Sequence, residues 1–296
     1  MHKKTFTLTD IVFNIINTII MLIVIVLCVF PFFYLFARAT SETNEIWNGR
    51  VFLWPVGFHT ENFRGVVEYV GFFNAYKNTI IYTITGTVLT LTVTSLCAYP
   101  LSKTNFLGRG VIMALFVGTM FFNGGLIPNF ILVSKLGLTN SMWALVLPIT
   151  FNHFYIILVM GSIQAIPIEL EEAAAIDGMN PFKILYSIIL PLCKPVLATV
   201  ALFCSLNIWN DWFSPMIYLH SNEKFPIMLL LRNIIMGIDA TMAGMNALIG
   251  IGPNLKMNST SLKSAAIILT VLPITAIYPF VQRYFVQGMT LGSIKG

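Results

Sequence analysis

The densest group of chemically capable side chains in this sequence is a run of carboxylates, namely Glu169, Glu171, Glu172 and Asp177. Pro167 precedes them and can begin a helix, whose positive N-terminal end favours nearby acids. The alanines Ala173–Ala175 keep such a helix thin, and Gly178 suits a left-handed stop. Because small side chains allow a partner to approach closely, the pattern predicts a short helix with a charged docking surface.

A second short helix is predicted directly after this one. Asn180 can cap it, and Pro181 occupies the first helical position, where a missing N–H has no cost. Its apolar residues are expected on one face: Phe182, Leu185, Ile188 and Ile189. The alternative is an amphipathic helix pair that lies on a membrane surface without docking, but that role does not require Glu, Gly and Pro at these separations.

A polar stripe within an apolar stretch is the second candidate site. It contains Asn207, Trp209, Asn210, Asp211 and Trp212. Asn207, Asp211 and Ser214 are expected on one helical face. A carboxylate in lipid costs about 2.5 kcal/mol or more, so Asp211 is expected to face a cavity, a partner or the outer interface. A helix cap or an interfacial ion pair without solute contact is the alternative.

Breaks are predicted in two other apolar helices. Asn152 and His153 follow Pro148, and a broken helix there exposes backbone carbonyls to a pathway. Asn152 is therefore a further pathway candidate, while a buried, hydrogen-bonded side chain is the alternative for His153. The pair Gly124-Gly125 predicts a second bend.

Signatures of catalysis are missing from the sequence. It contains no G-x-x-x-x-G-K-[ST] phosphate loop and no nucleophile elbow, and its four histidines have no metal-ligand spacing. The 17 basic residues form no stripe or cluster that would bind nucleic acid. We therefore expect no catalytic residue, no metal site and no nucleic-acid partner.

The composition indicates the elements that position these sites. Hydrophobic residues are 57% of the chain, charged residues are 10%, and mean hydropathy is +0.82, which is typical of an integral membrane protein. Six stretches are long enough to cross a hydrocarbon core of about 30 Å: residues 12–37, 76–99, 109–134, 141–163, 196–219 and 264–286. The prediction is an all-α membrane protein with six transmembrane helices in a single transmembrane domain, residues 1–296. The first stretch is too long for a cleaved signal peptide.

The run Glu172-Ala173-Ala174, with Gly178 and then Ile188-Ile189-Leu190-Pro191, closely resembles the cytoplasmic coupling loop of ABC importer permeases. Three other segments resemble the carbohydrate-uptake, maltose-transporter-like branch of that family, and its oligosaccharide subgroup in particular. They are Phe122-Asn123-Gly124-Gly125-Leu126-Ile127-Pro128, Trp209-Asn210-Asp211-Trp212-Phe213 and Gly288-Met289-Thr290-Leu291-Gly292-Ser293-Ile294-Lys295-Gly296. The resemblance covers nearly the whole chain.

This resemblance implies a permease in the cytoplasmic membrane that imports an oligosaccharide. Its implied partners are a second, similar permease, two ATPase subunits, an extracytoplasmic solute-binding protein and the membrane lipid. ATP and Mg would be held by the partner ATPase, so no cofactor is expected on this chain. Basic residues are nearly balanced between the two sides of the membrane, so the coupling loop, residues 167–195, decides the topology by facing ATP. Residues 220–263 are then extracytoplasmic.

The resemblance also implies roles for individual residues. Glu172 matches the glutamate that pairs with a basic residue of the ATPase. The predicted coupling surface is Glu172, Ala173, Ala174, Asp177, Gly178 and Met179. In the outer loop, Gly244, Met245 and Asn246 occupy the place that reaches the binding protein, and a loop that touches nothing is the alternative.

Three other classes of function stay open at this point. One is an ABC permease for a solute other than a sugar. Another is an ion-coupled secondary transporter or channel, in which Asp211 would carry a proton or ion, although no inverted repeat is visible. An intramembrane enzyme would need a nucleophile and base or a metal set, and the sequence offers neither.

Overall fold

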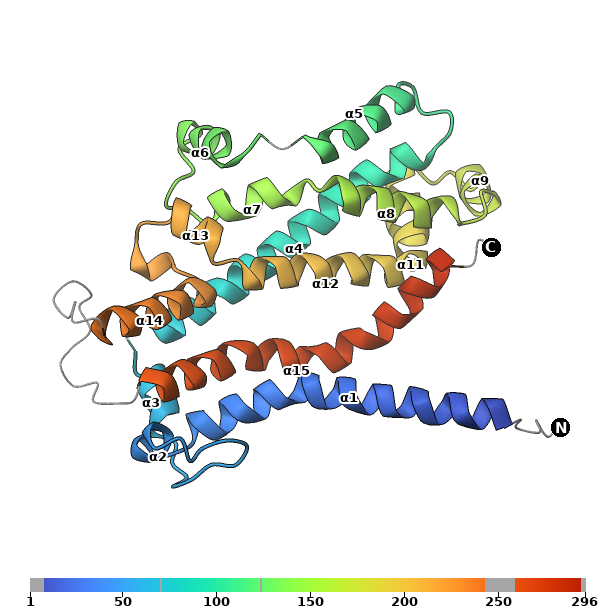
Figure 1. Ribbon diagram of the computed structural model, residues 1–296. Coiled ribbons are helices and arrows are strands. Elements are labelled where there is room, and N and C mark those ends of the chain that lie inside the picture. Colours follow the sequence, from blue (N-terminus) through green and yellow to red (C-terminus); the bar gives the residue numbers. More distant parts are fainter. Residues whose placement is uncertain (1–7, 70, 123, 243–258, 294–296) are drawn as a thin grey trace. The chain divides into compact units, whose positions relative to one another are not determined.

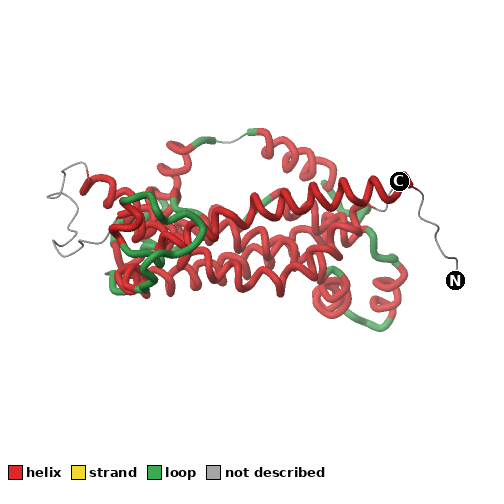
Figure 2. Tube along the Cα trace, turned by 60° about the horizontal axis from the view of Figure 1, so that its bottom comes forward, coloured by secondary structure: helices red, strands yellow, loops and turns green. Residues whose placement is uncertain are grey.

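The computed structural model describes residues 8–69, 71–122, 124–242 and 259–293 (Figure 1). These residues form helices joined by loops, and no strand occurs among them (Figure 2). The predicted all-α class is therefore confirmed. By contact between Cα atoms the chain divides into two units, Met1–Val70 with Asn233–Leu272, and Gly71–Arg232 with Pro273–Gly296.

The first unit is built around one long apolar helix. It contains α1 (Leu8–Ala39), α2 (Thr43–Trp47), α3 (Glu61–Val67), the end of α14 (Ile227–Met242) and the first part of α15 (Ser259–Ser293). Asp10 lies in the first turn of α1 and Arg38 in its last turn, where each charge complements the helix dipole. The end of α1 is fixed by α3, because Asn62 Nδ2 donates to the carbonyl of Ala39 at 2.9 Å.

The second unit contains both candidate sites. Its elements are α4 (Phe72–Ser102), α5 (Arg109–Phe121), α6 (Leu126–Lys135), α7 (Trp143–Thr150), α8 (His153–Gln164), α9 (Glu169–Ile176), α10 (Pro181–Ile184), the π-turn η1 (Leu185–Ile189), α11 (Leu190–Leu192), α12 (Lys194–Asn210), α13 (Phe213–Tyr218), the 3₁₀ turn η2 (Asn222–Lys224), the start of α14 and the end of α15. Helix α4 packs against α7, α8 and α12. Gly86 allows a close approach between α4 and α12, because a Cβ there would lie 2.5 Å from Cδ1 of Ile208 on α12.

The apolar core of this unit joins the coupling loop to the spans. Ile156 and Val159 of α8, Leu185 and Ile189 of η1, and Val200 of α12 are almost fully buried in one cluster. At one end of the unit lie α9 and the start of α5, and at the other end lie α6 and α13 (Figure 1). The two candidate sites therefore lie on elements that share a core.

Among the described residues, two helices, α1 and α4, are long and apolar enough to cross a membrane alone. Within the same described ranges, three pairs reach that length only as bent spans: α5 with α6, α7 with α8 at 45°, and Pro181–Leu192 with α12 at 83°. Helix α15, with 35 residues, is long enough for a further crossing. The structure confirms the predicted bend near Gly124-Gly125 and the predicted break before Asn152.

Two stretches differ from the sequence-based expectation. The fifth stretch is interrupted, because α12 ends at Asn210 and α13 begins at Phe213. The predicted outer loop, residues 220–263, holds η2, α14 and the beginning of α15. The single domain and the exact limits of its spans remain predictions.

Candidate functional site

Helix α9 has the stop that the sequence predicts. Gly178 has a φ of +79°, in the left-handed region, and its N–H donates to the carbonyl of Ala175 at 3.0 Å. The N–H of Met179 donates to the carbonyl of Ala174, also at 3.0 Å. These two bonds form a Schellman motif, which satisfies carbonyls that the helix end leaves free. The motif fixes the direction in which the chain leaves α9.

The exposed face of α9 carries both charge and apolar area. Glu172, Ala173 and Asp177 are exposed, as is Gly178, whereas Ala174 is buried against the unit's core. Ile176 is 87% exposed, an unusual position for an isoleucine that no partner covers. This combination of a carboxylate, small residues and an uncovered apolar side chain is suited to binding another protein.

The second short helix begins as predicted but continues differently. Asn180 Oδ1 accepts from the N–H of Lys183 at 2.8 Å, and Pro181 follows the cap. The expected common face is wrong for Phe182, which is 66% exposed, while Leu185 and Ile189 are buried. The reason is that α10 has only four residues before η1 begins, and a π-turn changes the angular spacing of side chains.

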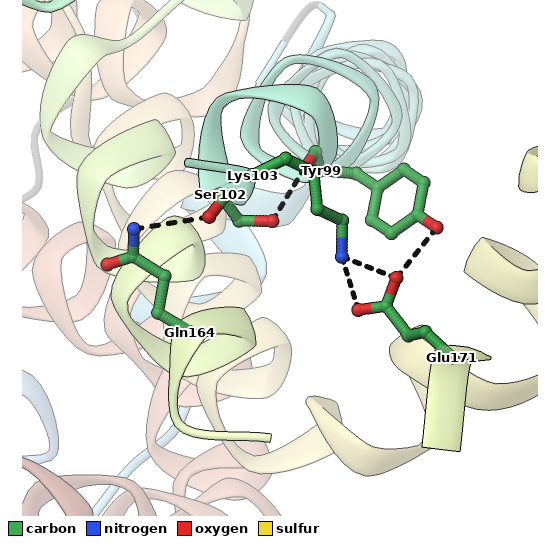
Figure 3. Close-up of polar contacts among 5 residues, drawn as sticks. All are labelled: Tyr99, Ser102, Lys103, Gln164 and Glu171. Atoms are coloured by element: carbon green, nitrogen blue, oxygen red, sulfur yellow. Dashed lines mark hydrogen bonds and ion pairs between the residues drawn. The ribbon is translucent and has the colours of Figure 1, made fainter. Parts of the chain in front are cut away.

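Glu171, next to the predicted Glu172, makes the polar contact that sequence reasoning missed. Both oxygens of its carboxylate contact Nζ of Lys103, and Oη of Tyr99 donates to its Oε2 at 3.0 Å (Figure 3). The Lys103 ammonium also lies 4.6 Å from the centroid of the Tyr99 ring. The spacing of Tyr99 and Lys103, four residues apart, places both side chains on one side of α4 but does not indicate Glu171 as their partner.

The polar stripe does not continue as one helix. The expected common face of Asn207, Asp211 and Ser214 is corrected, because the backbone leaves the helix at Asp211, where ψ is 112°. Asp211 Oδ1 accepts from the N–H groups of Phe213 and Ser214, both at 3.0 Å. A carboxylate competes well for such free backbone donors, which favours a helix end over a continuous helix.

Three of the predicted pathway residues still lie together. Asn207, Asn210 and Asp211 line an open depression of about 380 Å³ with Leu206. Asn207 and Asp211 also border a smaller cavity of about 20 Å³ beside Thr79 and Tyr82. The smaller cavity has room for about one water molecule, whereas the depression offers amide and carboxylate groups to a larger polar solute.

The other predicted pathway residues, Trp209, Trp212 and Asn152, do not line this depression. Trp209 is buried and packs edge-on against Tyr76, with ring centroids 6.4 Å apart. Trp212 is partly exposed, and the guanidinium of Arg232 lies 5.1 Å from its ring centroid. Asn152 caps α8, with its Oδ1 accepting from the N–H of Tyr155 at 3.3 Å.

The connection that leaves α13 is held by Asn140. Its Oδ1 accepts from the N–H groups of His220 and Ser221 at 3.1 Å each, and its Nδ2 donates to Oγ of Ser221 at 2.9 Å. Its carbonyl accepts from Nζ of Lys224 at 2.6 Å. Asn140 makes these bonds with a φ of +56°, which is uncommon outside glycine. This residue therefore fixes the start of the outer loop.

The predicted binding-protein contacts, Gly244, Met245 and Asn246, lie outside the described residues. Within the described ranges, no three His, Cys, Asp or Glu side chains come close enough to hold a metal ion.

Comparison with known proteins gives one negative and several positive results. No protein-family model matches the chain. The chain is 36% identical over 270 residues to the polygalacturonan/rhamnogalacturonan transport system permease protein YtcP of Bacillus subtilis (strain 168). This match covers 91% of this chain and 93% of that protein. The chain is 35% identical over 285 residues to Protein LplC of the same organism, covering 96% and 95% respectively.

A solved structure is similar over nearly the whole chain. It is a crystal structure of a bacterial ABC transporter involved in the import of the acidic polysaccharide alginate. The TM-score is 0.86 with 32% sequence identity, and the match covers 96% of this chain and 100% of that chain.

Proposed function

Because this chain belongs to the permease family of ABC sugar transporters, we propose that it forms part of an oligosaccharide pathway through the cytoplasmic membrane. The chain is a membrane transport protein and not an enzyme. In this proposal two separate ATPase subunits hydrolyse ATP, with Mg, and a second permease completes the pathway. An ABC transporter takes its energy from ATP, so Asp211 is not needed as an ion carrier.

The exposed face of α9 is the observation that carries the proposal. Glu172 lies on that face beside the small side chain of Ala173, and the Schellman motif at Gly178 holds the following turn. A basic pocket on an ATPase would pair with Glu172, while Ile176 and Phe182 supply the apolar contact area. ATP-driven closure of the two ATPases would then move α9, and with it the spans, between inward-facing and outward-facing states.

The open depression is the proposed place of solute contact in this chain. Asn207 and Asn210 provide amide donors and acceptors for sugar hydroxyls. Asp211 already uses Oδ1 to cap α13, so we assign it first to holding the break between α12 and α13. An extracytoplasmic binding protein would deliver the sugar to this side, with Gly244, Met245 and Asn246 as its proposed contacts.

For the substrate we propose an oligosaccharide that carries carboxylates. The support is that YtcP is described as a polygalacturonan/rhamnogalacturonan permease and that the similar structure imports alginate, an acidic polysaccharide. Asn207 and Asn210 are neutral, and Arg232 lies half-buried over Trp212 in the same unit. A neutral oligosaccharide is the second candidate.

The test is substrate-stimulated ATP hydrolysis by the complete purified transporter. The complex, reconstituted in lipid with its binding protein, receives neutral and uronate-containing oligosaccharides of equal length. Stimulation by the uronate series supports the full proposal, and stimulation by neutral sugars alone overturns its acidic part. Stimulation only by amino acids or inorganic phosphate would overturn the sugar assignment.

A further inference from the structure

Adjacent glutamates on α9 have opposite surroundings. The side chain of Glu171 is only 14% exposed and faces Lys103 and Tyr99, whereas Glu172 is exposed. Ala174, one helical turn beyond Glu171, is buried on the same inner face. Helix α9 therefore has one face available to a partner and one face bound to its own chain.

The inner contact reaches the end of a membrane span. Lys103 is the C-terminal cap of α4, where a positive charge also suits the helix dipole. Nζ of Lys103 contacts both oxygens of Glu171, and Tyr99 donates to one of them, so the carboxylate is held in a three-membered cluster (Figure 3). A carboxylate held by two donors from one helix has a fixed orientation as well as a fixed position.

The receiving end of α4 is itself held by other spans. Gln164 at the end of α8 donates to the carbonyl of Ser102 at 3.4 Å, and Ser102 Oγ donates to the carbonyl of Tyr99 at 2.6 Å (Figure 3). Arg109 at the start of α5 donates through Nε to the carbonyl of Leu101 at 2.8 Å. The last turn of α4 is thus bound to α5, α8 and α9.

From this geometry we propose that Glu171, Lys103 and Tyr99 are positioning residues that make α9 and α4 move as one body during transport. The proposal rests on the docking role given to α9 above. Apolar packing of Ala174 keeps α9 close to the bundle, and the polar cluster adds the direction in which a displacement of α9 is passed to α4. Since α4 packs along α12, the displacement reaches the helix that carries Asn207 and Asn210.

The first experiment separates transmission from docking. Glu171→Gln and Lys103→Gln are compared with Glu61→Gln, a control that removes an exposed carboxylate on α3, outside the proposed docking helix. In the reconstituted complex we expect the two cluster variants to keep the ATPase subunits and their ATP hydrolysis, and to raise the number of ATP molecules hydrolysed per sugar imported at least threefold. The exchanged pair Glu171→Lys with Lys103→Glu should recover most of the wild-type ratio.

Two results would overturn the proposal. One is a wild-type ratio of ATP to sugar in both single variants. The other is loss of the ATPase subunits from those variants, which would make the cluster part of docking. Failure of the docking role itself is seen separately, as normal assembly and transport by Glu172→Lys.

The second experiment tests whether the two helices move together. Cysteines replace Glu171 and Lys103 in a chain without native cysteines, and a short bismaleimide joins them. If α9 and α4 move as one body, we expect this cross-link to restore the transport activity that the two substitutions lower. If α9 and α4 separate in the transport cycle, the linked protein is instead blocked, and the proposal fails.

Discussion

The hydroxyl of Thr79 on α4 accepts a hydrogen bond from the backbone N–H of Ile227 at 2.8 Å, at the first residue of α14. Nearby, Asn78 Nδ2 donates to the carbonyls of Glu223 at 2.6 Å and Phe225 at 3.2 Å, and Oη of Tyr82 donates to the carbonyl of Lys224 at 3.0 Å. The N-terminal part of α4 is thus bound to the loop between α13 and α14, as its C-terminal end is bound to α9. One helix therefore contacts both α9, which we assign to the ATPase, and the start of the predicted outer loop, residues 220–263.

Reversal of the charge at Glu172 should stop transport. We expect Glu172→Lys to insert and fold normally, because the side chain is exposed, and to lower sugar uptake at least about tenfold by placing a like charge against a basic pocket. Glu61→Lys, which reverses an exposed charge on α3, is the control. Uptake in vesicles and co-purification of the ATPase are measured, and equal uptake by both variants would contradict the docking role.

Substitutions at Gly178, in the turn after α9, should act through the backbone conformation and not through steric clashes. A Cβ at Gly178 would meet nothing within 4 Å, so a substitution there costs only the strain of positive φ. We expect Gly178→Val to lower stability by about 1–2 kcal/mol and to impair transport. Gly178→Asn should behave more like wild type, because asparagine tolerates this region. Equal thermal unfolding midpoints for the two variants would be inconsistent with this explanation.

Asn140 should stabilise the outer loop through two separable properties. Asn140→Asp keeps the acceptor for His220 and Ser221, Asn140→Gly keeps the positive φ alone, and Asn140→Ala loses both. Each lost hydrogen bond costs about 0.5–1.5 kcal/mol. Thermal unfolding midpoints should therefore fall in the order Asn, Asp, Gly, Ala. If the unfolding midpoint of Asn140→Ala lay above that of Asn140→Gly, the positive φ at this position would not limit stability.

Asp211 should act chiefly through its cap. In Asp211→Asn an amide oxygen can accept the same bonds from Phe213 and Ser214, so assembly and transport should stay within about twofold of wild type. Asp211→Leu removes the acceptor and should lower both. A large loss of transport in Asp211→Asn would show that the charge itself is used.

Asn210→Leu should spare assembly and weaken sugar-stimulated ATP hydrolysis, as one lost hydrogen bond to sugar is worth about 0.5–1.5 kcal/mol.

Cysteine labelling should locate both the sides of the membrane and the ATPase footprint. In a background without native cysteines, Asn222→Cys should react with an impermeant maleimide from outside, and Ile176→Cys only after permeabilisation. Co-expression of the ATPase subunits should then protect Ile176→Cys, whose parent side chain is 87% exposed in the single chain. Labelling of both cysteines from the same side would refute the topology.

Local signals explain what the sequence could predict. The stop at Gly178, the cap at Asn180 and the break before Asn152 depend on residues within one or two turns, and the structure has all three. The pair between Lys103 and Glu171 joins residues 68 apart, so no local pattern indicates it. The sequence leaves two roles open for Asp211, because one carboxylate can both cap a helix and line a depression. Its hydrogen bonds from Phe213 and Ser214 show the capping role.

The threonines of α4 have a consequence for how the protein is made. Thr83, Thr87, Thr90 and Thr94 have buried hydroxyls without a hydrogen-bond partner among the described residues. The most apolar 18-residue window of α4 has a mean hydropathy of 1.6, compared with 3.0 for α1. Helix α4 is the less apolar of the two, and it packs against α7, α8 and α12, which the ribosome produces later. We therefore expect the membrane insertion of α4 to depend on these later helices more than that of α1 does.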